Sequence, residues 1–172
     1  MINCAKNKLL AAEDIIATKH NSERIMVFSE TIESIQRLKE MLQNKGIKSM
    51  LIDSKLNSKK RQIILSEWGK EFFPLLSVHT LEIGYDVPEV RVAIILATSS
   101  NMNQIVQRIG RTIRKTAGKD TALIYTIYLS YTRDLNTLKM VRQATDVVVH
   151  ENKGQRVSNS TTTAANLDRF IV

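Results

Sequence analysis

The stretch Val92-Ala93-Ile94-Ile95-Leu96-Ala97 places six apolar residues in a row, past the middle of the 172-residue chain. A strand with one face in water alternates apolar and polar residues, whereas a strand that is apolar throughout is covered on both faces. The stretch therefore predicts a central strand of a parallel sheet.

Predicted strands and helices alternate on both sides of this segment. Short apolar runs that end in polar turns predict strands, and apolar residues at helical spacing predict the helices between them. Gly46 and Gly69 lie where helix C-caps are expected. The predicted strands are 25–28, 47–52, 75–78 and 122–129, and the predicted helices are 33–45, 58–68, 101–115 and 132–149. This alternation predicts an α/β fold, a three-layer α/β/α sandwich around a mainly parallel sheet.

The composition divides the chain into three parts. Residues 1–22 have helical composition and are predicted to be an N-terminal helical lead-in, and residues 23–150 carry the alternating elements. Residues 151–172 are rich in Lys, Gly, Asn, Ser and Thr, which predicts a flexible polar tail. Cys4 is the only cysteine, which excludes an intrachain disulfide and a cysteine-based zinc cluster and fits a reducing compartment.

The net charge of the chain is +8, from 25 Lys and Arg against 17 Asp and Glu. A basic balance favours polyanionic partners, nucleic acid above all, although many soluble domains are basic without such a partner. No apolar run approaches the ~20 residues of a membrane span, and the first residues do not resemble a secretory signal. We expect an intracellular protein, cytoplasmic or nuclear (in the host cell if viral), with no membrane partner.

The segment QRIGRTIR at residues 107–114 carries the chemistry. On a helix, Gln107, Gly110, Arg111 and Arg114 fall on one face at i, i+3, i+4 and i+7. Arginine offers a charged planar fork that matches phosphate oxygens, glycine lets a ligand approach, and glutamine can orient a water or a phosphate oxygen. The stripe predicts a polyphosphate site. The alternative is a solvated basic face, but a glycine in mid-helix costs roughly 0.5–1 kcal/mol and needs a reason.

This segment resembles motif VI of superfamily 2 helicases, whose usual form is (Q/H)RxGRxxR. TLEIGYDVP at 80–88 resembles motif V, IMVFS at 25–29 resembles motif IV, and 52–54 with Arg61 and Trp68 resembles motif IVa. All four follow in family order. The chain is similar to the second RecA-like domain of a superfamily 2 helicase, most of all to XPB-type DNA repair helicases and related viral and phage helicases.

The resemblance implies catalytic roles for Arg111, Arg114 and Gln107. The two arginines match arginine fingers, which reach the γ-phosphate of ATP on a partner domain and stabilise charge in the phosphoryl-transfer transition state. Gln107 matches the residue beside the nucleotide and the attacking water. Arg108 points about 100° from the finger stripe on a helix, so a structural ion pair is the preferred interpretation.

A second implied group binds the cofactor and comprises Asp86, Gly84 and Gly110. Asp86 matches the motif V aspartate near the ribose, and Gly84 matches a glycine whose backbone contacts the ligand. The alternative for Asp86, which precedes Val-Pro, is that it only shapes a turn.

A third implied group grips the phosphates of a nucleic-acid strand and comprises Ser29, Thr31, Ser54, His79 and Thr80. Such a grip, through hydroxyls and backbone N–H groups, is largely indifferent to sequence. Ser29, Thr31 and Ser54 have helix capping as their alternative role. His79 is not expected to bind a metal, and no metal site is predicted.

The chain has neither a P-loop nor an acidic Mg²⁺ motif. ATP and Mg²⁺ are therefore expected to be held mainly by a first RecA-like domain, in cis or as a separate chain, and this chain alone is expected to be inactive. The expected function is the second motor domain of an ATP-dependent helicase or translocase. DNA is favoured over RNA, because Gln107 and Ile113 stand where DEAD-box proteins usually have histidine and glycine. The alternative is a non-catalytic RecA-like adaptor or nucleic-acid-binding module.

Overall fold

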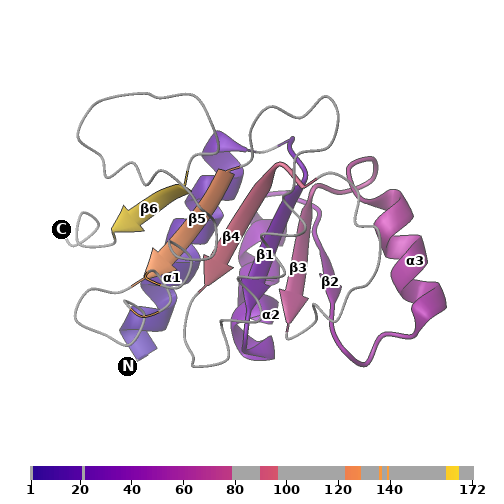
Figure 1. The fold of residues 1–172 in the computed structure, drawn as a ribbon, viewed down its shortest axis with the longest axis horizontal. Coiled ribbons are helices and arrows are strands. Elements are labelled where there is room, and N and C mark those ends of the chain that lie inside the picture. The colour runs from indigo at the N-terminus through magenta and orange to yellow at the C-terminus, as the bar shows by residue number, and fades with distance from the viewer. Residues whose placement is uncertain are drawn as a thin grey trace.

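A parallel six-stranded sheet organises the domain, with the strand order β2-β3-β1-β4-β5-β6 (Figure 1). The computed structural model describes residues 2–20, 22–78, 90–96, 123–128, 136, 139 and 162–166. The strands are β1 (Ile25–Ser29), β2 (Met50–Ile52), β3 (Pro74–Val78), β4 (Val92–Leu96), β5 (Leu123–Tyr128) and β6 (Thr162–Asn166). Every neighbouring pair runs parallel, as the alternation predicts.

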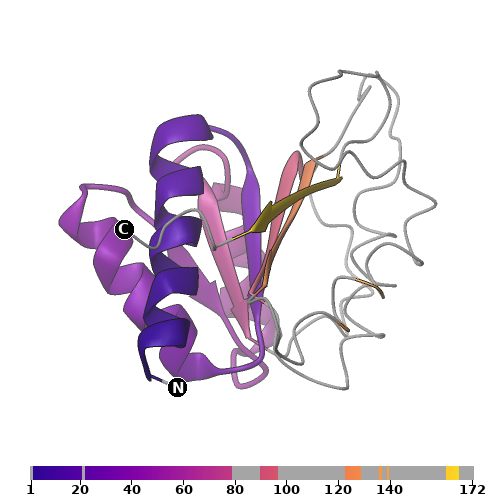
Figure 2. The same ribbon diagram turned by 90° about the vertical axis from the view of Figure 1, so that its left-hand side faces the viewer.

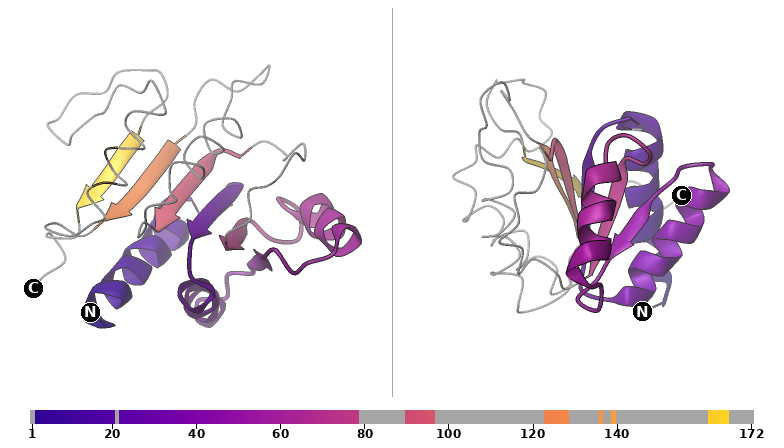
Figure 3. Two further views of the ribbon diagram at one scale, coloured as in Figure 1. Left: turned by 60° about the horizontal axis from the view of Figure 1, so that its bottom comes forward. Right: turned by 90° about the vertical axis from the view of Figure 1, so that its right-hand side faces the viewer.

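Helices α1 (Ile2–Asp14) and α2 (Ile32–Asn44) pack together against one face of the sheet (Figures 2 and 3). A short π-helical segment, η1 (Ile15–Lys19), continues α1. Helix α3 (Ser58–Glu67) lies beyond β2 in Figure 1 and contributes to the core of the other face. None of the helices among the described residues has the length and apolar content that crossing a membrane requires.

The core has two clusters, one on each face of the sheet. Successive residues of β1 alternate between them: Ile25 and Val27 join the cluster under α1 and α2, while Met26 and Phe28 join the cluster with α3. Every residue of β4 is buried, and β4 lies between β1 and β5. The prediction of a central strand is therefore confirmed over Val92–Leu96, and Ala97 lies outside the described residues.

Gly46 and Gly69 end α2 and α3 as the sequence predicts, with φ angles of +73° and +82°. The Gly46 N–H bonds to the Gln43 carbonyl and the Ile47 N–H to the Leu42 carbonyl, both at 2.9 Å, which is a Schellman motif. This motif explains why β2 is shorter than the predicted strand 47–52. Ile47 is used to close the helix, and the strand begins only at Met50.

The N-terminal segment is part of the core rather than a lead-in to it. Leu9, Ala12 and Ile16 repeat at helical spacing and are buried against the sheet and α2. The Lys45 ammonium lies 3.6 Å from the Glu13 carboxylate and links α2 to α1.

β6 lies in the segment for which the sequence predicted a flexible polar tail, and there the structure differs. Residues Thr162–Asn166 pair parallel with Ile124–Tyr128 of β5. Two β-branched threonines, Thr162 and Thr163, favour a strand once a partner strand is available, which composition alone does not reveal. The predicted helices 101–115 and 132–149 lie outside the described residues, except that Asn136 and Lys139 are helical.

Candidate functional site

The candidate site lies at the edge of the sheet where the strands end. Ser29 at the end of β1 is in register with Val78 of β3 and Leu96 of β4, and Ile52 of β2 with Ser77 of β3. The loops after these four strands therefore begin side by side at one edge. In open parallel sheets, ligands bind in the crevice outside the carboxyl ends of the strands. The segments that resemble motifs IV and IVa include the ends of β1 and β2, the segment that resembles motif V begins at Thr80 just after β3, and the segment that resembles motif VI lies between β4 and β5 in the sequence.

The Ser29 side chain holds the loop between β1 and α2. Ser29 is only 4% exposed. Its hydroxyl oxygen accepts a hydrogen bond from the Thr31 N–H at 3.3 Å and lies 3.4 Å from the Thr31 carbonyl, to which it donates. A hydroxyl that is buried and engaged in this way shapes a turn. The predicted roles for Ser29 were contact with a strand phosphate and helix capping; this geometry favours a different role, in which Ser29 positions Thr31, the N-cap residue of α2.

Thr31 stands exposed at the start of α2 as its N-cap residue. Its side chain makes no capping hydrogen bond; its hydroxyl donates instead to the Ser34 hydroxyl at 2.7 Å. The first N–H groups of an α-helix have no partner within the helix and carry partial positive charge. The start of α2 therefore offers hydroxyl and backbone donors at the carboxyl edge of the sheet.

The loop between β2 and α3 is held in one shape by its own polar groups. A carboxylate oxygen of Asp53 accepts from the N–H groups of Lys55 at 2.9 Å and Leu56 at 3.1 Å. The Arg61 guanidinium donates to the carbonyls of Asp53 and Leu56, both at 3.2 Å. Arg61 therefore has a structural role in this loop. Ser54 is exposed in this loop.

Sequence reasoning missed Lys55, which is also exposed beside Ser54. The feature of the sequence that could have identified Lys55 is its place as a basic residue in a loop that follows a predicted strand. Capping of α3 belongs to Asn57, whose side chain accepts from the Lys60 N–H at 2.8 Å, so Ser54 is not the cap. Trp68 is 0% exposed and its indole N–H donates to the Phe73 carbonyl, so it is a core residue.

The remaining predicted site residues lie outside the described residues. They are Gln107, Gly110, Arg111 and Arg114 between β4 and β5, with Arg108, and His79, Thr80, Gly84 and Asp86 between β3 and β4. His79 and Thr80 directly follow Val78 in the chain.

A buried polar network lies at the opposite edge, where β1 and β5 begin. His20 is hydrogen-bonded through Nε2 to the Tyr125 hydroxyl at 2.8 Å and through Nδ1 to the Glu23 carboxylate at 3.1 Å. Burial, and secondarily the charge of Glu23, raise the pKa of the Tyr125 hydroxyl above its usual value. The network joins the end of η1 to β5, far along the sheet from the candidate site. Within the described ranges, no cluster of His, Cys, Asp and Glu side chains is arranged to hold a metal ion.

Comparison with known families gives one match that covers most of the chain. Residues 6–116 match the family described as the helicase conserved C-terminal domain. The chain is 31% identical to the UvrABC system protein B of Mycoplasma mycoides subsp. mycoides SC over 132 residues. This aligned region covers 71% of this chain and 19% of that protein. The chain is 29% identical over 116 residues to a putative ATP-dependent RNA helicase of Methanocaldococcus jannaschii, covering 63% of this chain and 15% of that one.

Solved structures give the same fold. The helicase domain of Hef from Pyrococcus furiosus matches with a TM-score of 0.59 at 25% identity, over 77% of this chain and 28% of that one. The E. coli DEAD-box protein SrmB matches with a TM-score of 0.66 at 17% identity, over 92% of this chain and 84% of that one. The predicted RecA-like fold is confirmed by these matches. The chain spans less than a fifth of the length of the two curated relatives above.

Proposed function

Because the chain belongs to the helicase conserved C-terminal domain family, we propose that it is the second motor domain of an ATP-dependent superfamily 2 DNA helicase or translocase. It supplies arginine fingers to the ATP site and part of the grip on the strand. The observation that carries the proposal is the register of β1 to β4. This register ends the four strands at one edge of the sheet, and the segments that resemble motifs IV, IVa, V and VI lie at these strand ends or in the connections that follow them in the sequence.

The catalytic part of the proposal rests on Gln107, Arg111 and Arg114, in the segment that connects β4 to β5. ATP with Mg²⁺ supplies the phosphoryl group when it is bound on the first RecA-like domain. The two guanidiniums fit that ligand, because arginine stays charged and matches phosphate oxygens. Their role is to stabilise the charge that develops during transfer, and the role of Gln107 is to orient the attacking water. Asp86, Gly84 and Gly110 contact the nucleotide from the same domain.

The strand grip in this proposal uses donors from two loops. Thr31 contributes a hydroxyl, and the residues of the first turn of α2 contribute backbone N–H groups. Ser54 and Lys55 contribute a hydroxyl and an ammonium from the β2–α3 loop that Arg61 holds. His79 and Thr80 extend the same edge from the end of β3. Such donors read phosphates rather than bases, so the grip is independent of sequence.

DNA is the proposed nucleic acid. The DNA proposal is supported by Gln107 and Ile113, which differ from the residues usual in DEAD-box RNA helicases, and by the basic charge of +8, which suits any nucleic acid. The relatives include a putative RNA helicase, so the assay must contain both nucleic acids.

The decisive experiment restores the missing half of the motor. The chain is combined with a first RecA-like domain that carries a P-loop, fused or as a separate chain, and ATPase is measured with no nucleic acid, with single-stranded DNA and with single-stranded RNA. Arg111→Ala and Arg114→Ala should each lower the stimulated rate by about 10³-fold or more, the range known for arginine fingers. Arg37→Ala is the matched control, since Arg37 is exposed on α2.

Three outcomes separate the alternatives. A stimulated rate that survives Arg111→Ala and Arg114→Ala contradicts the finger assignment. Strand binding without any contribution to turnover identifies an adaptor. Stimulation by RNA but not by DNA contradicts the choice of DNA.

A further inference from the structure

A pocket of about 500 Å³ lies near the amino ends of β2 and β3, whereas the proposed motor face lies at the carboxyl ends of the strands. Its lining comes from the last turns of α2, the end of α3 and the connections that lead from these helices into the two strands. We call it the amino-end pocket. None of the residues assigned to ATP or strand binding lines it, so it carries an inference that is separate from the motor proposal.

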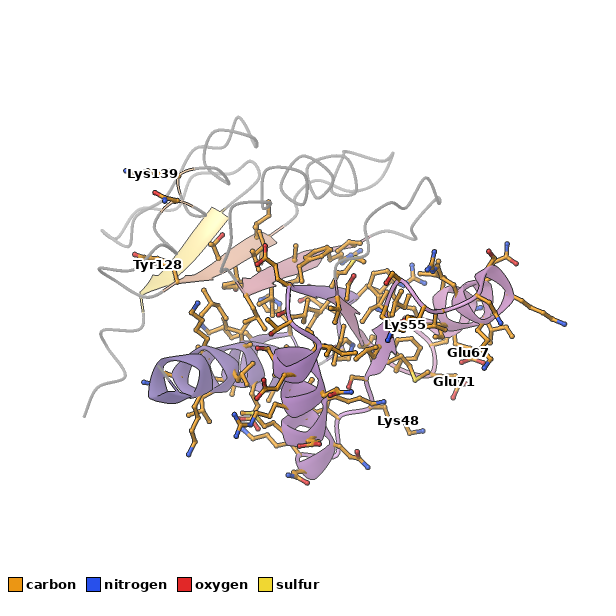
Figure 4. All side chains as sticks on the ribbon, turned by 90° about the horizontal axis from the view of Figure 1, so that it is seen from below. Lys48, Lys55, Glu67, Glu71, Tyr128 and Lys139 are labelled. Atoms are coloured by element: carbon orange, nitrogen blue, oxygen red, sulfur yellow. The ribbon has the colours of Figure 1, made fainter. Side chains whose placement is uncertain are left out.

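The two walls of the amino-end pocket carry opposite charges. Lys39 and Lys48 line it from the α2 side, and Glu67 and Glu71 line it from the α3 side. Among the residues that the structure describes, these four charged groups form no ion pair with one another or with any other side chain. Figure 4 shows the side chains of Lys48, Glu67 and Glu71 projecting from this margin of the molecule. Each wall can therefore engage a charged group of a ligand, and the two walls need groups of opposite sign.

Between its charged walls the amino-end pocket is mostly apolar. Phe72 is buried, and Ile47 and Met50 are half-buried. Ser49 lines the same pocket and is 8% exposed, and its hydroxyl has no hydrogen-bond partner in the described part of the chain. A buried hydroxyl without a partner costs free energy, which a polar atom of a ligand can recover. A volume within about 300–1,000 Å³, an apolar lining and a few polar groups are typical of sites for small molecules.

We propose that the amino-end pocket binds a small zwitterion of amino-acid type, whose ammonium and carboxylate are separated by an apolar spacer. The ammonium faces Glu67 and Glu71, and the carboxylate faces Lys39 and Lys48. The spacer lies on the apolar surface around Phe72. A ligand with charges of one sign alone would satisfy one wall and be repelled by the other, and nucleic acid is disfavoured for this reason because its phosphates would meet two carboxylates.

The first test varies the ligand. ω-Amino acids with progressively longer methylene chains are titrated into the full 172-residue chain, labelled with ¹⁵N, and amide chemical shifts are followed by NMR. We expect shift changes centred on the residues that line the pocket, and an affinity that rises with chain length to an optimum, because the two charges must reach both walls. The N-acetyl derivative of the best ω-amino acid lacks the ammonium, and its methyl ester lacks the carboxylate. Each should bind about fivefold more weakly or less well still, since the ion pairs with one wall are lost.

The second test varies the charged walls of the protein. The variant Glu67→Gln/Glu71→Gln should bind the best ω-amino acid about fivefold more weakly than the parent chain does. The same variant should bind the N-acetyl derivative as the parent chain does, because that ligand has no ammonium to place against the carboxylates. The control Glu33→Gln/Glu40→Gln makes the same change of charge at two exposed positions of α2 outside the pocket and should leave binding unchanged.

A third test separates ligand binding from stability. Ser49→Ala removes the buried hydroxyl and should weaken the best ω-amino acid by about twofold to tenfold, the effect of one hydrogen bond. Its urea unfolding midpoint should equal or exceed that of the parent, because the hydroxyl has no partner in the described part of the chain. A lower midpoint with unchanged affinity would show that Ser49 serves the fold and not the ligand.

The proposal is overturned if no ω-amino acid shifts the resonances of the pocket, if both singly charged derivatives bind as well as the zwitterion, or if the two double variants bind it equally. All of these measurements use the chain alone, without ATP, nucleic acid or a first RecA-like domain. A failure here therefore leaves the motor proposal intact, and a failure of the motor proposal leaves this one intact.

Discussion

Replacing Gly69 with alanine is expected to destabilise the domain much more than the same change at Gly46. Both glycines end a helix with a left-handed φ, +82° and +73°. A Cβ added at Gly46 meets nothing within 4 Å. A Cβ added at Gly69 would lie 2.9 Å from Cγ and 3.0 Å from Cδ of Arg24, and closer still to its Nε. Comparing the two alanine variants therefore separates the cost of the left-handed backbone conformation, which both share, from the cost of crowding Arg24, which occurs only at Gly69.

The expected magnitudes follow from three contributions. The left-handed conformation costs a non-glycine residue about 1–2 kcal/mol. The loss of unfolded-state entropy on changing glycine to alanine offsets about 0.4–1 kcal/mol of this. Gly46→Ala should therefore cost roughly 0.5–1 kcal/mol. At Gly69 the crowding of Arg24 adds the overpacking cost of about 1–3 kcal/mol, which gives about 1.5–4 kcal/mol in all.

The assay is urea unfolding of the parent chain and of each variant. Far-UV circular dichroism follows the whole domain, and the fluorescence of Trp68, the single tryptophan, follows the neighbourhood of Gly69. The double variant Arg24→Ala/Gly69→Ala removes the side chain that is crowded, so a coupling energy of about 1–2 kcal/mol is expected from the double-mutant cycle. Equal losses at Gly46 and Gly69, or a coupling near zero, would show that the approach of Arg24 has no energetic weight.

Three further changes test other contacts. Tyr125→Phe removes the hydroxyl that is bonded to His20 and should lower the free energy of unfolding by about 1–2 kcal/mol, with Tyr128→Phe in the same strand as control. Because the pKa of the Tyr125 hydroxyl is raised in the folded state, the contribution of this hydroxyl to the free energy of unfolding is present below pH ~10 and is lost as the pH rises through the folded pKa. The parent chain should therefore lose stability above pH ~10 faster than Tyr125→Phe does, and equal losses would contradict this. Arg61→Ala removes the side chain that holds the β2–α3 loop and should lower the free energy of unfolding by about 1–3 kcal/mol. It should also weaken the binding of single-stranded nucleic acid, so unchanged binding in a filter assay would argue against a role for this loop in strand binding. Asn57→Ala removes the cap of α3 and should cost about 0.5–2 kcal/mol in thermal unfolding, whereas no loss would deny the cap any role.

Much of the sheet was predictable because its signals are local. The buried run at Val92–Leu96, the helical spacing of Ile35, Leu38 and Leu42, and the glycine that ends each helix all lie within one element. The missed features depend on contacts between distant parts of the chain. β6 pairs with the edge that β5 offers, and the close approach of Arg24 adds to the need for glycine at position 69.

In the candidate site too, residue types were predictable from local sequence, whereas roles that depend on contacts were not. The residue types at Ser29, Thr31 and Ser54 were predictable from their places after strands, but burial and bonding decide their roles. Ser29 turns inward and holds the loop, while Thr31 and Ser54 remain exposed. Lys55 was missed because a single lysine in a polar loop carries no periodic signal. No spacing in the sequence identifies the partnership of His20 and Tyr125, which are 105 residues apart.

The packing of α1 also has a consequence for how the chain folds during synthesis. Helix α1 leaves the ribosome before the strands that cover it, since part of the surface that buries Leu9 and Ile16 is provided by β4 and β5, which begin more than seventy residues later in the chain. Until then its apolar face has no complete partner, and an incompletely covered face of this kind is exposed to aggregation. Contacts between residues far apart in the sequence also form slowly, so the packing of α1 against β4 and β5 is expected to be a late step of folding. We therefore expect the domain to complete its packing only after β5, which carries Ile127, has been synthesised.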